Sequence, residues 1–362
     1  MTLPVAPPRT ALADIAAAVQ PQLETFLEER RDLVEPVGPV FAEATAGLAR
    51  FVLRGGKRIR PAFAWTGWLA GGGRPDGAVA EAALRACSSL EFVQACALIH
   101  DDIIDASLTR RGYPTTHREF AQVHAERGWS GSSEKFGEAT AILLGDLALA
   151  WADDMFLGAG LEPERYLRAA RAWAAMRTEV LGGQLLDIVS EAARDESADA
   201  AERVVRFKTA GYTVERPLHV GAALAGASDE TIAALRAIGV DIGVAFQLRD
   251  DLLGAFGDPA VTGKPSGDDL RSGKHTPMLA HALATGGGAA DELRGLVGTD
   301  LDDAGVERAR AALRATGAPS AMQARVEELT ARATSAIAQA PIADGARPVL
   351  ARLAAVLVDR AA

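Results

Sequence analysis

The chain has 362 residues, of which 49% are hydrophobic and only 5% aromatic, and its formal net charge is −10 at pH 7. An acidic chain lacks the positive field that nucleic acids and anionic membranes require, so we expect neither as a partner. Its two cysteines, Cys87 and Cys96, lie within an apolar helical pattern. This pattern predicts neither a disulfide framework nor a zinc site, and it favours buried thiols in a reducing compartment.

The first ten residues, MTLPVAPPRT, contain three prolines, and we expect residues 1–10 to form a disordered lead-in. They lack the basic start and the apolar stretch of a targeting signal. No window reaches the roughly 18 uncharged apolar residues expected of a membrane span. The sequence therefore predicts a cytoplasmic protein that is not integral to a membrane.

From residue 11 to residue 362, helix-forming residues fill every long segment, and no alternating strand pattern is convincing. Glycine-rich or polar breaks separate these segments at 71–77, 126–137, 195–199, 257–269 and 285–291. None of the breaks has the length or composition of an interdomain linker. We therefore predict a single all-α domain over residues 11–362, with almost no sheet.

The first candidate site along the chain is the sequence GGKRIRP at 55–61, a basic island in an acidic protein. Its glycines allow the backbone to approach an anion closely. Lys57 and Arg60, three positions apart, share one face of a helix. The segment is therefore a candidate anion site, although a basic helix start without function has the same pattern.

The next candidate is ALIHDDIIDASLTRRGYP at 97–114, where an apolar helix runs into aspartates and then arginines. Asp101 and Asp105 lie four positions apart, so on a helix their carboxylates repel each other unless a cation neutralises them. Mg²⁺ prefers such oxygen ligands and commonly shares them with phosphates. The guanidinium groups of Arg110 and Arg111 match phosphate oxygens. A solvated acidic face is the alternative interpretation.

A second acidic helix appears in QLRDDLLG at 247–254, where Asp250 and Asp251 echo the aspartates of the first motif. Two acidic helices of this kind can face each other across a metal site. Between the two motifs lies the segment 118–138, which we expect to form a surface loop near the mouth of the site.

Five motifs occur in one order: GGKRIRP, LIHDDIID followed by RRGYP, the Lys208–Thr209 pair, FQLRDD, and GKPSGDDLRSGKHTP. Over about residues 45–280 this set resembles the trans-isoprenyl diphosphate synthases. The resemblance implies the isoprenoid synthase fold, a bundle of long helices around a deep central cavity, usually as a homodimer. The implied reaction joins isopentenyl diphosphate head to tail with dimethylallyl, geranyl or farnesyl diphosphate.

The resemblance also implies roles for individual residues. For the metal it implies about three Mg²⁺ ions on Asp101, Asp102, Asp105, Asp250 and Asp251. For the allylic diphosphate it implies contacts with Arg110, Lys208 and Lys264. For isopentenyl diphosphate it implies Lys57, Arg60, Gln94 and Arg111. The remaining implied residues are Gln184 and Thr209, near the carbocation, and Gln247 and Lys274, as further substrate contacts.

Product length is predicted from the residues beneath the first aspartate motif. Helical stacking places Ala97 one turn and Val93 two turns below Asp101, with Cys96 beside them. Synthases that stop at fifteen carbons generally carry aromatic residues here, whereas Cys96 and Ala97 are small. We therefore predict geranylgeranyl diphosphate, with twenty carbons, as the product.

The floor of the cavity is predicted at Trp173 and Met176, on a second helix and before Gln184. One departure from the family pattern is Gly254, which stands where the family usually has an aspartate. The alternatives are a synthase of another chain length, a catalytically silent subunit of a heteromeric synthase, and a terpene cyclase.

Overall fold

The structure, a computed structural model, describes residues 11–257 and 267–358. The lead-in predicted at residues 1–10 lies outside the described residues. The N-terminal part of the chain forms α1 (Leu12–Glu29), α2 (Arg31–Val34), the 3₁₀ turn η1 (Glu35–Val37), α3 (Pro39–Leu53), α4 (Ile59–Ala70), α5 (Ala78–Ser88), α6 (Leu90–Ile104), β1 (Thr109–Arg110), β2 (Tyr113–Pro114), α7 (Thr116–Glu126), α8 (Ser133–Leu157) and α9 (Pro163–Ala193).

The remaining part of the chain is also helical. Its elements are α10 (Ala198–Val204), the π-helix η2 (Val205–Glu215), α11 (Arg216–Ala225), α12 (Asp229–Phe256), α14 (Asp268–Ser272), α15 (Pro277–Ala284), α16 (Gly287–Leu296), α17 (Asp303–Ala315), α18 (Ala318–Gln339), the 3₁₀ turn η3 (Asp344–Ala346) and α19 (Arg347–Val358). Within the described residues, the only sheet is the antiparallel pair β1–β2. The all-α prediction is therefore confirmed.

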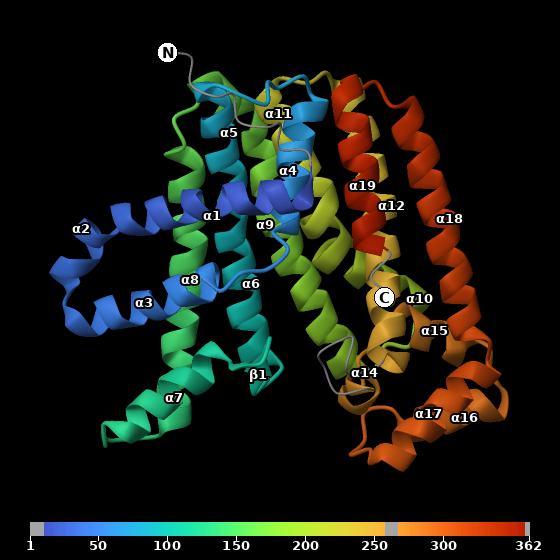
Figure 1. The fold of residues 1–362 in the computed structure, drawn as a ribbon. Coiled ribbons are helices and arrows are strands. Elements are labelled where there is room, and N and C mark those ends of the chain that lie inside the picture. The colour runs from blue at the N-terminus through green and yellow to red at the C-terminus, as the bar shows by residue number, and fades with distance from the viewer. Residues whose placement is uncertain (1–10, 258–266, 359–362) are drawn as a thin grey trace.

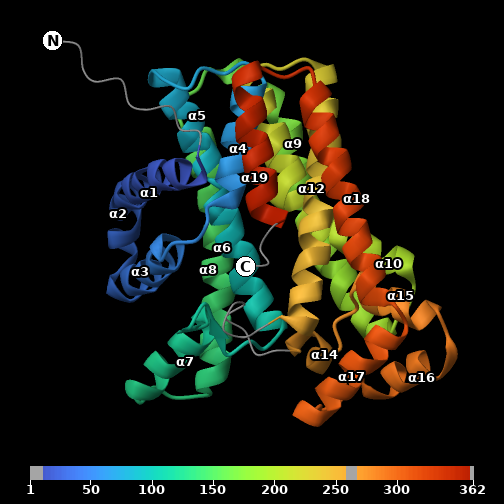
Figure 2. The same ribbon diagram turned by 45° about the vertical axis from the view of Figure 1, so that its right-hand side comes forward.

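The long helices α6, α8, α9 and α12 form the bundle, with α18 and α19 beside α12 (Figures 1 and 2). Helices α1–α3 cross the outside of α6 and α8 (Figure 1). The β1–β2 hairpin and α7 lie at one end of the bundle, and α14–α17 lie at the same end on the other side (Figure 2). This end brings together the two aspartate motifs.

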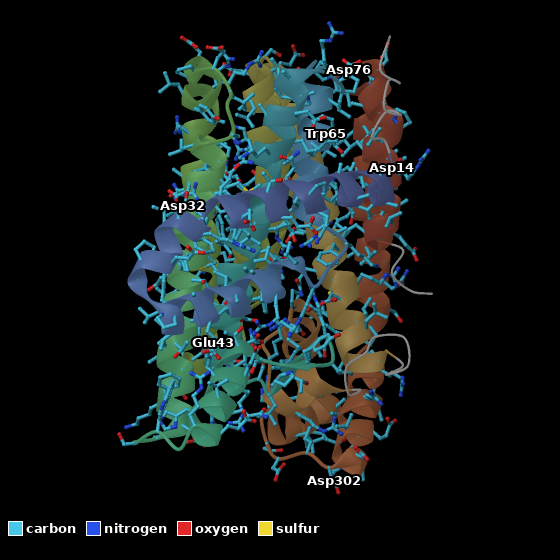
Figure 3. All side chains as sticks on the ribbon, turned by 60° about the vertical axis from the view of Figure 1, so that its left-hand side comes forward. Asp14, Asp32, Glu43, Trp65, Asp76 and Asp302 are labelled. Atoms are coloured by element: carbon cyan, nitrogen blue, oxygen red, sulfur yellow. The ribbon has the colours of Figure 1, made fainter. Side chains whose placement is uncertain are left out.

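Aromatic packing fixes α6, which carries the first aspartate motif, against its neighbours. Phe92 of α6, Phe26 of α1 and Trp151 of α8 meet edge to face, with ring centroids between 5.1 and 6.2 Å apart. Burying each such side chain contributes roughly 2–3 kcal/mol. Figure 3 shows Trp65 among the helices, whereas Asp32 and Asp302 lie at the periphery.

Glycines allow α4 and α11 to pack with their backbones in contact. A Cβ atom built on Gly67 would lie 2.2 Å from the carbonyl oxygen of Leu218. One built on Gly221 would lie 1.7 Å from the carbonyl oxygen of Ala64. No side chain fits in either place, so glycine at both positions sets the spacing of these helices.

The segment 118–138 differs from the sequence prediction of a surface loop. Most of it is helical, since α7 extends to Glu126 and α8 begins at Ser133. Ser132 caps α8 by accepting a hydrogen bond from the backbone N–H of Lys135. Aromatic contacts of Trp129 with His124 and Phe136 hold the short turn between the two helices. Polar residues cover the exposed face of α7, and for this reason the segment has the composition of a loop although it is helical.

Both cysteines are free and buried, as predicted. Burial raises the pKa of Cys96 to about 12. It also raises the pKa of Cys87 above its ordinary value. Neither thiol is therefore a reactive nucleophile near neutral pH.

Two helical stretches satisfy the length and hydropathy criteria for a membrane span, which allow up to two charged residues in a window. They are Ala78–Ile104 and Asp229–Phe256, with mean hydropathies of 1.3 and 1.5. Of their most apolar windows, 67% and 44% of the residues are buried inside the fold. Core helices satisfy the same criteria, so these stretches are weak evidence for a membrane span.

Candidate active site

A cavity of about 280 Å³ lies between α6, α9, η2 and α12. Its lining contains both the polar residues of the sequence motifs and the apolar residues beneath them. The lining residues are Arg60, Val93, Gln94, Cys96, Ala97, Leu98, His100, Asp101, Leu149, Arg177, Val180, Leu181, Gln184, Lys208, Thr209, Tyr212, Thr213, Phe246, Gln247 and Asp250.

At the polar end of this cavity, Asp101 contacts three other polar side chains. Its carboxylate accepts a hydrogen bond from Gln184 Nε2 at 3.2 Å and lies 3.3 Å from Lys208 Nζ. Arg110 Nη2 approaches the same carboxylate at 3.4 Å. Three separate elements, α9, η2 and β1, therefore converge on the last turn of α6.

Asp102, the next residue of the motif, points into the protein. Its side chain is fully buried and accepts a 2.7 Å hydrogen bond from Arg110 Nε. Burial raises the pKa of Asp102 above its ordinary value, although the bond to Arg110 opposes the shift. Asp102 thus orients Arg110. Its Oδ2 atom is buried and has no hydrogen-bond partner within residues 11–257 and 267–358.

Asp105 caps the C-terminus of α6, one turn beyond Asp101, and its side chain is exposed. Its backbone N–H donates to the carbonyl of Asp101 at 2.8 Å, so the two residues keep the helical relationship that the sequence predicted. Partial desolvation, followed by repulsion from Asp101, raises the pKa of Asp105 to about 6. A neighbouring cation would relieve this repulsion.

Lys208 is held by two carboxylates. Its Nζ atom lies 2.6 Å from Asp187 Oδ2 and 3.3 Å from Asp101 Oδ1. Burial opposes the charge, but the two aspartates outweigh it and raise the pKa of Lys208. The lysine is therefore a fixed positive charge beside the first aspartate motif.

In the second aspartate motif, as in the first, one aspartate faces the cavity and the next is buried. Asp250 lines the cavity, whereas Asp251 is buried and accepts a 2.7 Å hydrogen bond from Gln247 Nε2. Lys274 Nζ lies 4.0 Å from Asp251 Oδ1. Burial raises the pKa of Asp251 to about 7. One oxygen of Asp251, Oδ2, is buried and has no hydrogen-bond partner among the described residues.

Gly254, the departure from the family pattern, faces another carboxylate. An ideal Cβ atom at this position would lie 2.1 Å from Asp269 Oδ2. The carboxylate of Asp269 therefore occupies the space of the missing side chain.

Arg111 connects the β1–β2 hairpin to the basic segment 55–61. It donates a 2.8 Å hydrogen bond to the carbonyl of Gly55, and its guanidinium covers Gly56, where a Cβ atom would lie 3.1 Å from Nη1. Desolvation lowers the pKa of Arg111, and the nearby arginines add to this effect. Lys57 lies beside this loop and is exposed.

Arg60 reaches the cavity from the same segment. Its guanidinium lies 4.1 Å from the ring centroid of Tyr212 and donates to Thr213 Oγ1 at 3.0 Å. The Tyr212 hydroxyl in turn donates to Gln94 Oε1. By contrast, Arg58 is buried and pairs with Glu91, so it anchors the loop inside the protein.

The predicted wall of the cavity is present, but the predicted floor is not. Val93, Cys96 and Ala97 line the cavity, whereas Trp173 and Met176 do not. Trp173 instead stacks on Phe156 with the ring centroids 4.2 Å apart. The floor prediction was wrong because Trp173 and Met176 point from α9 into the core.

Arg177, one turn from Trp173, lies in the cavity lining instead. It pairs with Asp153, which also accepts a 2.6 Å hydrogen bond from Trp173 Nε1. Along α9, Arg177 is seven residues from Gln184, or about 10 Å at the rise of an α-helix. Arg177 therefore joins the cavity lining about 10 Å from Gln184 along α9.

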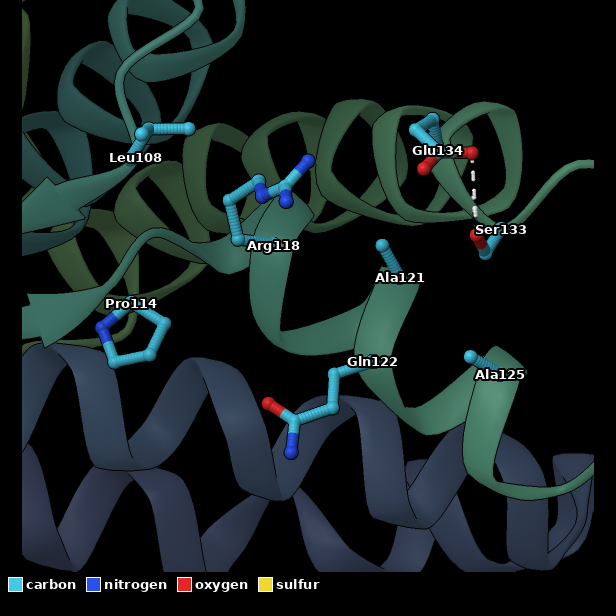
Figure 4. Close-up of a pocket in the computed structure, with 8 residues that line it drawn as sticks. All are labelled: Leu108, Pro114, Arg118, Ala121, Gln122, Ala125, Ser133 and Glu134. Carbon is cyan, nitrogen blue, oxygen red and sulfur yellow. Dashed lines mark hydrogen bonds between the residues drawn. The ribbon is translucent and has the colours of Figure 1, made fainter.

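A second hollow, of about 370 Å³, lies beside the hairpin and α7 (Figure 4). Leu108 and Pro114 border it on one side, and Ser133 and Glu134 at the start of α8 border it on the other. None of the residues predicted for the site lines it.

The acidic residues fit a metal ion whose coordination shell is completed by a bound substrate. Within the described residues, no three histidine, cysteine or acidic side chains form a ready-made metal cluster. Asp101, Asp250 and Lys208 nevertheless line one cavity, and Asp105 is close enough to Asp101 and Lys208 for their charges to act on it. Mg²⁺ is typically held by one or two carboxylates and by substrate phosphates, which matches this open arrangement. The implied phosphate ligand Lys264 lies outside the described residues.

Comparison with known proteins identifies the family. Residues 43–314 match the polyprenyl synthetase family. The chain belongs to this family. It is 32% identical over 311 residues to the geranylfarnesyl diphosphate synthase of Aeropyrum pernix, which covers 84% of this chain and 91% of the relative. It is 35% identical over 288 residues to the geranylgeranyl diphosphate synthase of Mycobacterium tuberculosis, covering 79% and 75% of the two chains.

Solved structures agree with this assignment. The fold matches the geranylgeranyl pyrophosphate synthase of Corynebacterium glutamicum, a structure complexed with isoprenyl diphosphate and magnesium, with a TM-score of 0.92 and 46% identity. The match covers 97% of this chain and 99% of that one. As a polyprenyl synthetase, the protein has the isoprenoid synthase fold and is a trans-prenyltransferase that acts on prenyl diphosphates. The family depends on Mg²⁺.

Sequence reasoning missed three residues of this synthase site: Asp187, Arg177 and Tyr212. Asp187 stands one turn after Gln184 on α9, and Arg177 stands two turns before it, so helical spacing from Gln184 would have indicated both. No such signal marks Tyr212, because η2 does not have α-helical periodicity.

Proposed function

We propose that this synthase makes geranylgeranyl diphosphate from isopentenyl diphosphate and a shorter allylic diphosphate. The observation that carries the proposal is the small Cys96–Ala97 wall directly beneath Asp101. A tail that leaves the polar end of the cavity passes these two side chains without a steric stop. Geranylgeranyl diphosphate synthases among the relatives support the same chain length.

The polar end of the cavity separates charge during the reaction. Bound Mg²⁺ would be held by Asp101, Asp105 and Asp250, and it would neutralise the charge that develops on the leaving diphosphate. Lys208 and Arg110 are fixed beside Asp101 and present positive charge to the same anion. Their pre-paired geometry avoids reorganisation during ionisation.

The second diphosphate site distinguishes chain elongation from terpene cyclisation. Arg111, bound to the Gly55 carbonyl, and Arg60, stacked on Tyr212, form a basic group around the segment 55–61, and Arg60 reaches the cavity from there. A cyclase ionises one diphosphate and needs no second anion site. We therefore assign these two arginines, together with Lys57 and Gln94, to isopentenyl diphosphate.

The test is incubation of the purified chain with Mg²⁺, isopentenyl diphosphate and each of dimethylallyl, geranyl and farnesyl diphosphate, followed by chain-length analysis. A C20 product from all three primers supports the proposal. A product of another length would overturn the C20 assignment. Absence of any elongation by the chain alone would favour a silent subunit of a heteromeric synthase.

A longer product is the second candidate. Geranylfarnesyl diphosphate synthases are among the relatives, at 32% and 33% identity. The absence of Trp173 and Met176 from the cavity lining removes the aromatic floor that would stop a longer tail. Arg177, which lines the cavity beyond Gln184, is the remaining obstacle.

We also propose that the synthase is a homodimer in the cytoplasm. Half of the exposed large hydrophobic side chains in the described part of the chain lie on α8 and α9. They are Ile142, Leu143, Leu157, Leu167, Leu181, Leu185, Leu186, Ile188 and Val189. An apolar surface of this kind favours burial against a second copy. Light scattering of Leu143→Asp tests this, with Val79→Asp as an exposed control on α5; a dimeric Leu143→Asp protein would contradict the assignment.

A further inference from the structure

The element that carries Lys208 and Thr209 is a π-helix of 11 residues, η2. At its end the backbone N–H of Arg216 donates to the carbonyl of Gly211, five positions earlier. Most π-helical segments are single turns within α-helices, and they often occur at functional sites. An element of this length therefore requires specific contacts that favour it over the α-helix.

Two residues of η2 pair in a way that only this helix permits. Arg206 Nη1 lies 2.6 Å from Glu215 Oε2, nine positions along the chain. In an α-helix nine residues make about 2.5 turns, so the two side chains would lie on opposite faces. In a π-helix, with about 4.4 residues per turn, nine residues make about two turns and bring them to one face.

The surroundings of the pair make it specific. The Glu215 side chain is only 1% exposed. Among the described residues, Arg206 Nη1 and Glu215 Oε2 make no hydrogen bond, either with each other or with another group, so their 2.6 Å contact is an ion pair without hydrogen-bond geometry. Between them lies Gly211, where a Cβ atom would be 3.2 Å from Arg206 Nη1. Glycine here gives the guanidinium room to cross the helix.

Neighbouring helices fit closely around this register. A Cβ atom on Gly183 of α9 would lie 2.3 Å from the backbone nitrogen of Lys208. One on Gly243 of α12 would lie 2.6 Å from the Cα atom of Ala210. A change of helix type would rotate the residues between 206 and 215 against these two contacts.

We propose that the Arg206–Glu215 ion pair, crossing at Gly211, selects the π-helical register of η2 and thereby positions Lys208 and Thr209. Arg206 and Glu215 are positioning residues, since neither of them lines the cavity. Buried ion pairs contribute little net stability but can specify register. The proposal rests on the prenyl transfer assigned to this cavity and not on the product length.

Arg236 of α12 provides a matched control. Its Nε and Nη2 atoms both lie 2.9 Å from Glu215 Oε1. Arg206→Gln and Arg236→Gln therefore each remove one guanidinium from the same carboxylate, but only Arg206 belongs to η2. At saturating substrates, we expect Arg206→Gln to lower kcat by about tenfold or more and Arg236→Gln to stay within about twofold. Equal losses in kcat would overturn the proposal.

A double-mutant cycle tests whether Arg206 acts through the residues that it positions. In a Lys208→Ala/Thr209→Ala background, Arg206→Gln should lower the residual kcat by less than about twofold. A full tenfold loss in that background would contradict the proposal. Arg206→Lys, which keeps the charge, should recover most of the wild-type kcat.

Thermal unfolding of each variant separates positioning from folding. If Arg206→Gln does not fold, Gly211→Ala provides the second test, because it crowds the pair and leaves both charges in place. It should lower kcat as Arg206→Gln would, and an unchanged kcat would overturn the proposal. An inactive wild-type chain would refute the assigned reaction instead, so the two failures are distinguishable.

Discussion

The carboxylate of Asp269 lies where a side chain at Gly254 would begin, with Oδ2 2.1 Å from the position of an ideal Cβ atom. The second aspartate motif lacks its usual fifth-position acid, yet a carboxylate is present there from α14. Asp269 also raises the pKa of Asp251 and of Lys274, which shows that its charge acts on the same group of residues. Glycine at position 254 therefore leaves the space that the carboxylate of Asp269 occupies.

Asp269→Asn tests this relationship through the metal requirement. Removing a carboxylate near the metal ligands typically costs about 10–100-fold in metal affinity or activity. We expect the Mg²⁺ concentration for half-maximal activity to rise by about tenfold, measured by Mg²⁺ titration of prenyl transfer. Asp291→Asn, on an exposed helix face, is the control. An unchanged Mg²⁺ requirement in Asp269→Asn would show that Asp269 only fills space.

Asp101→Ala removes the carboxylate that contacts Gln184, Lys208 and Arg110 at the polar end of the cavity. Its carboxylate orients Gln184 and Lys208, and we assign it to the metal. We expect kcat to fall by roughly two to four decades, or about 3–5 kcal/mol of transition-state stabilisation. Steady-state kinetics with farnesyl and isopentenyl diphosphates measure this, and exposed Asp154→Asn should keep the wild-type rate. A wild-type rate in Asp101→Ala would refute the metal assignment.

Product length should respond to changes at Ala97 and at Arg177 in opposite directions. Ala97→Phe adds an aromatic ring one turn below Asp101, so the main product should shorten. Arg177→Ala shortens a side chain that lines the cavity beyond Gln184, so longer products should appear. Trp173→Ala should lower Tm without changing product length, because its ring packs on Phe156. Chain-length analysis of the three variants checks all three outcomes; a longer product from Trp173→Ala would restore it as the floor.

Stability without metal should fall as pH rises. Burial raises the pKa of Asp251 from 3.8 to about 7, so the folded chain keeps a proton that the unfolded chain releases. Stability therefore decreases between about pH 4 and pH 7 and then levels off. Between pH 5 and pH 7.5 the Tm of wild type should decrease. The decrease should be a few degrees smaller for Asp251→Asn. Parallel curves for the two proteins would contradict the assignment.

Local sequence patterns predicted the fold class and the acidic and basic motifs, whereas the resemblance to the family supplied the other polar residues of the candidate site. Helix formers without strand alternation indicated an all-α chain, and the spacing of Asp101 and Asp105 indicated their shared face. The small residues Cys96 and Ala97, predicted to lie beneath Asp101, line the cavity. These features depend on helical periodicity, which the spacing of residues within one short segment determines.

Other features depended on packing between distant segments, which no local pattern contains. Trp173 has the spacing of a cavity residue, but contact with Phe156 turns it into the core. Asp269 fills the space at Gly254 only because the chain returns after residues 258–266. The separate roles of Asp101 and Asp102 follow from the position of Arg110, on a hairpin outside the helix.

By itself, the sequence determined that this chain forms long helices, that two of them carry acidic motifs, and that basic segments accompany these motifs. The tertiary structure decided which side chain of each acidic pair faces the cavity, which residue of α9 lines it beyond Gln184, and that Lys208 sits on a π-helix. The reason is physical. Helix formation follows from interactions a few residues apart, whereas burial, charge pairing and helix register at the site depend on contacts between segments far apart in the chain.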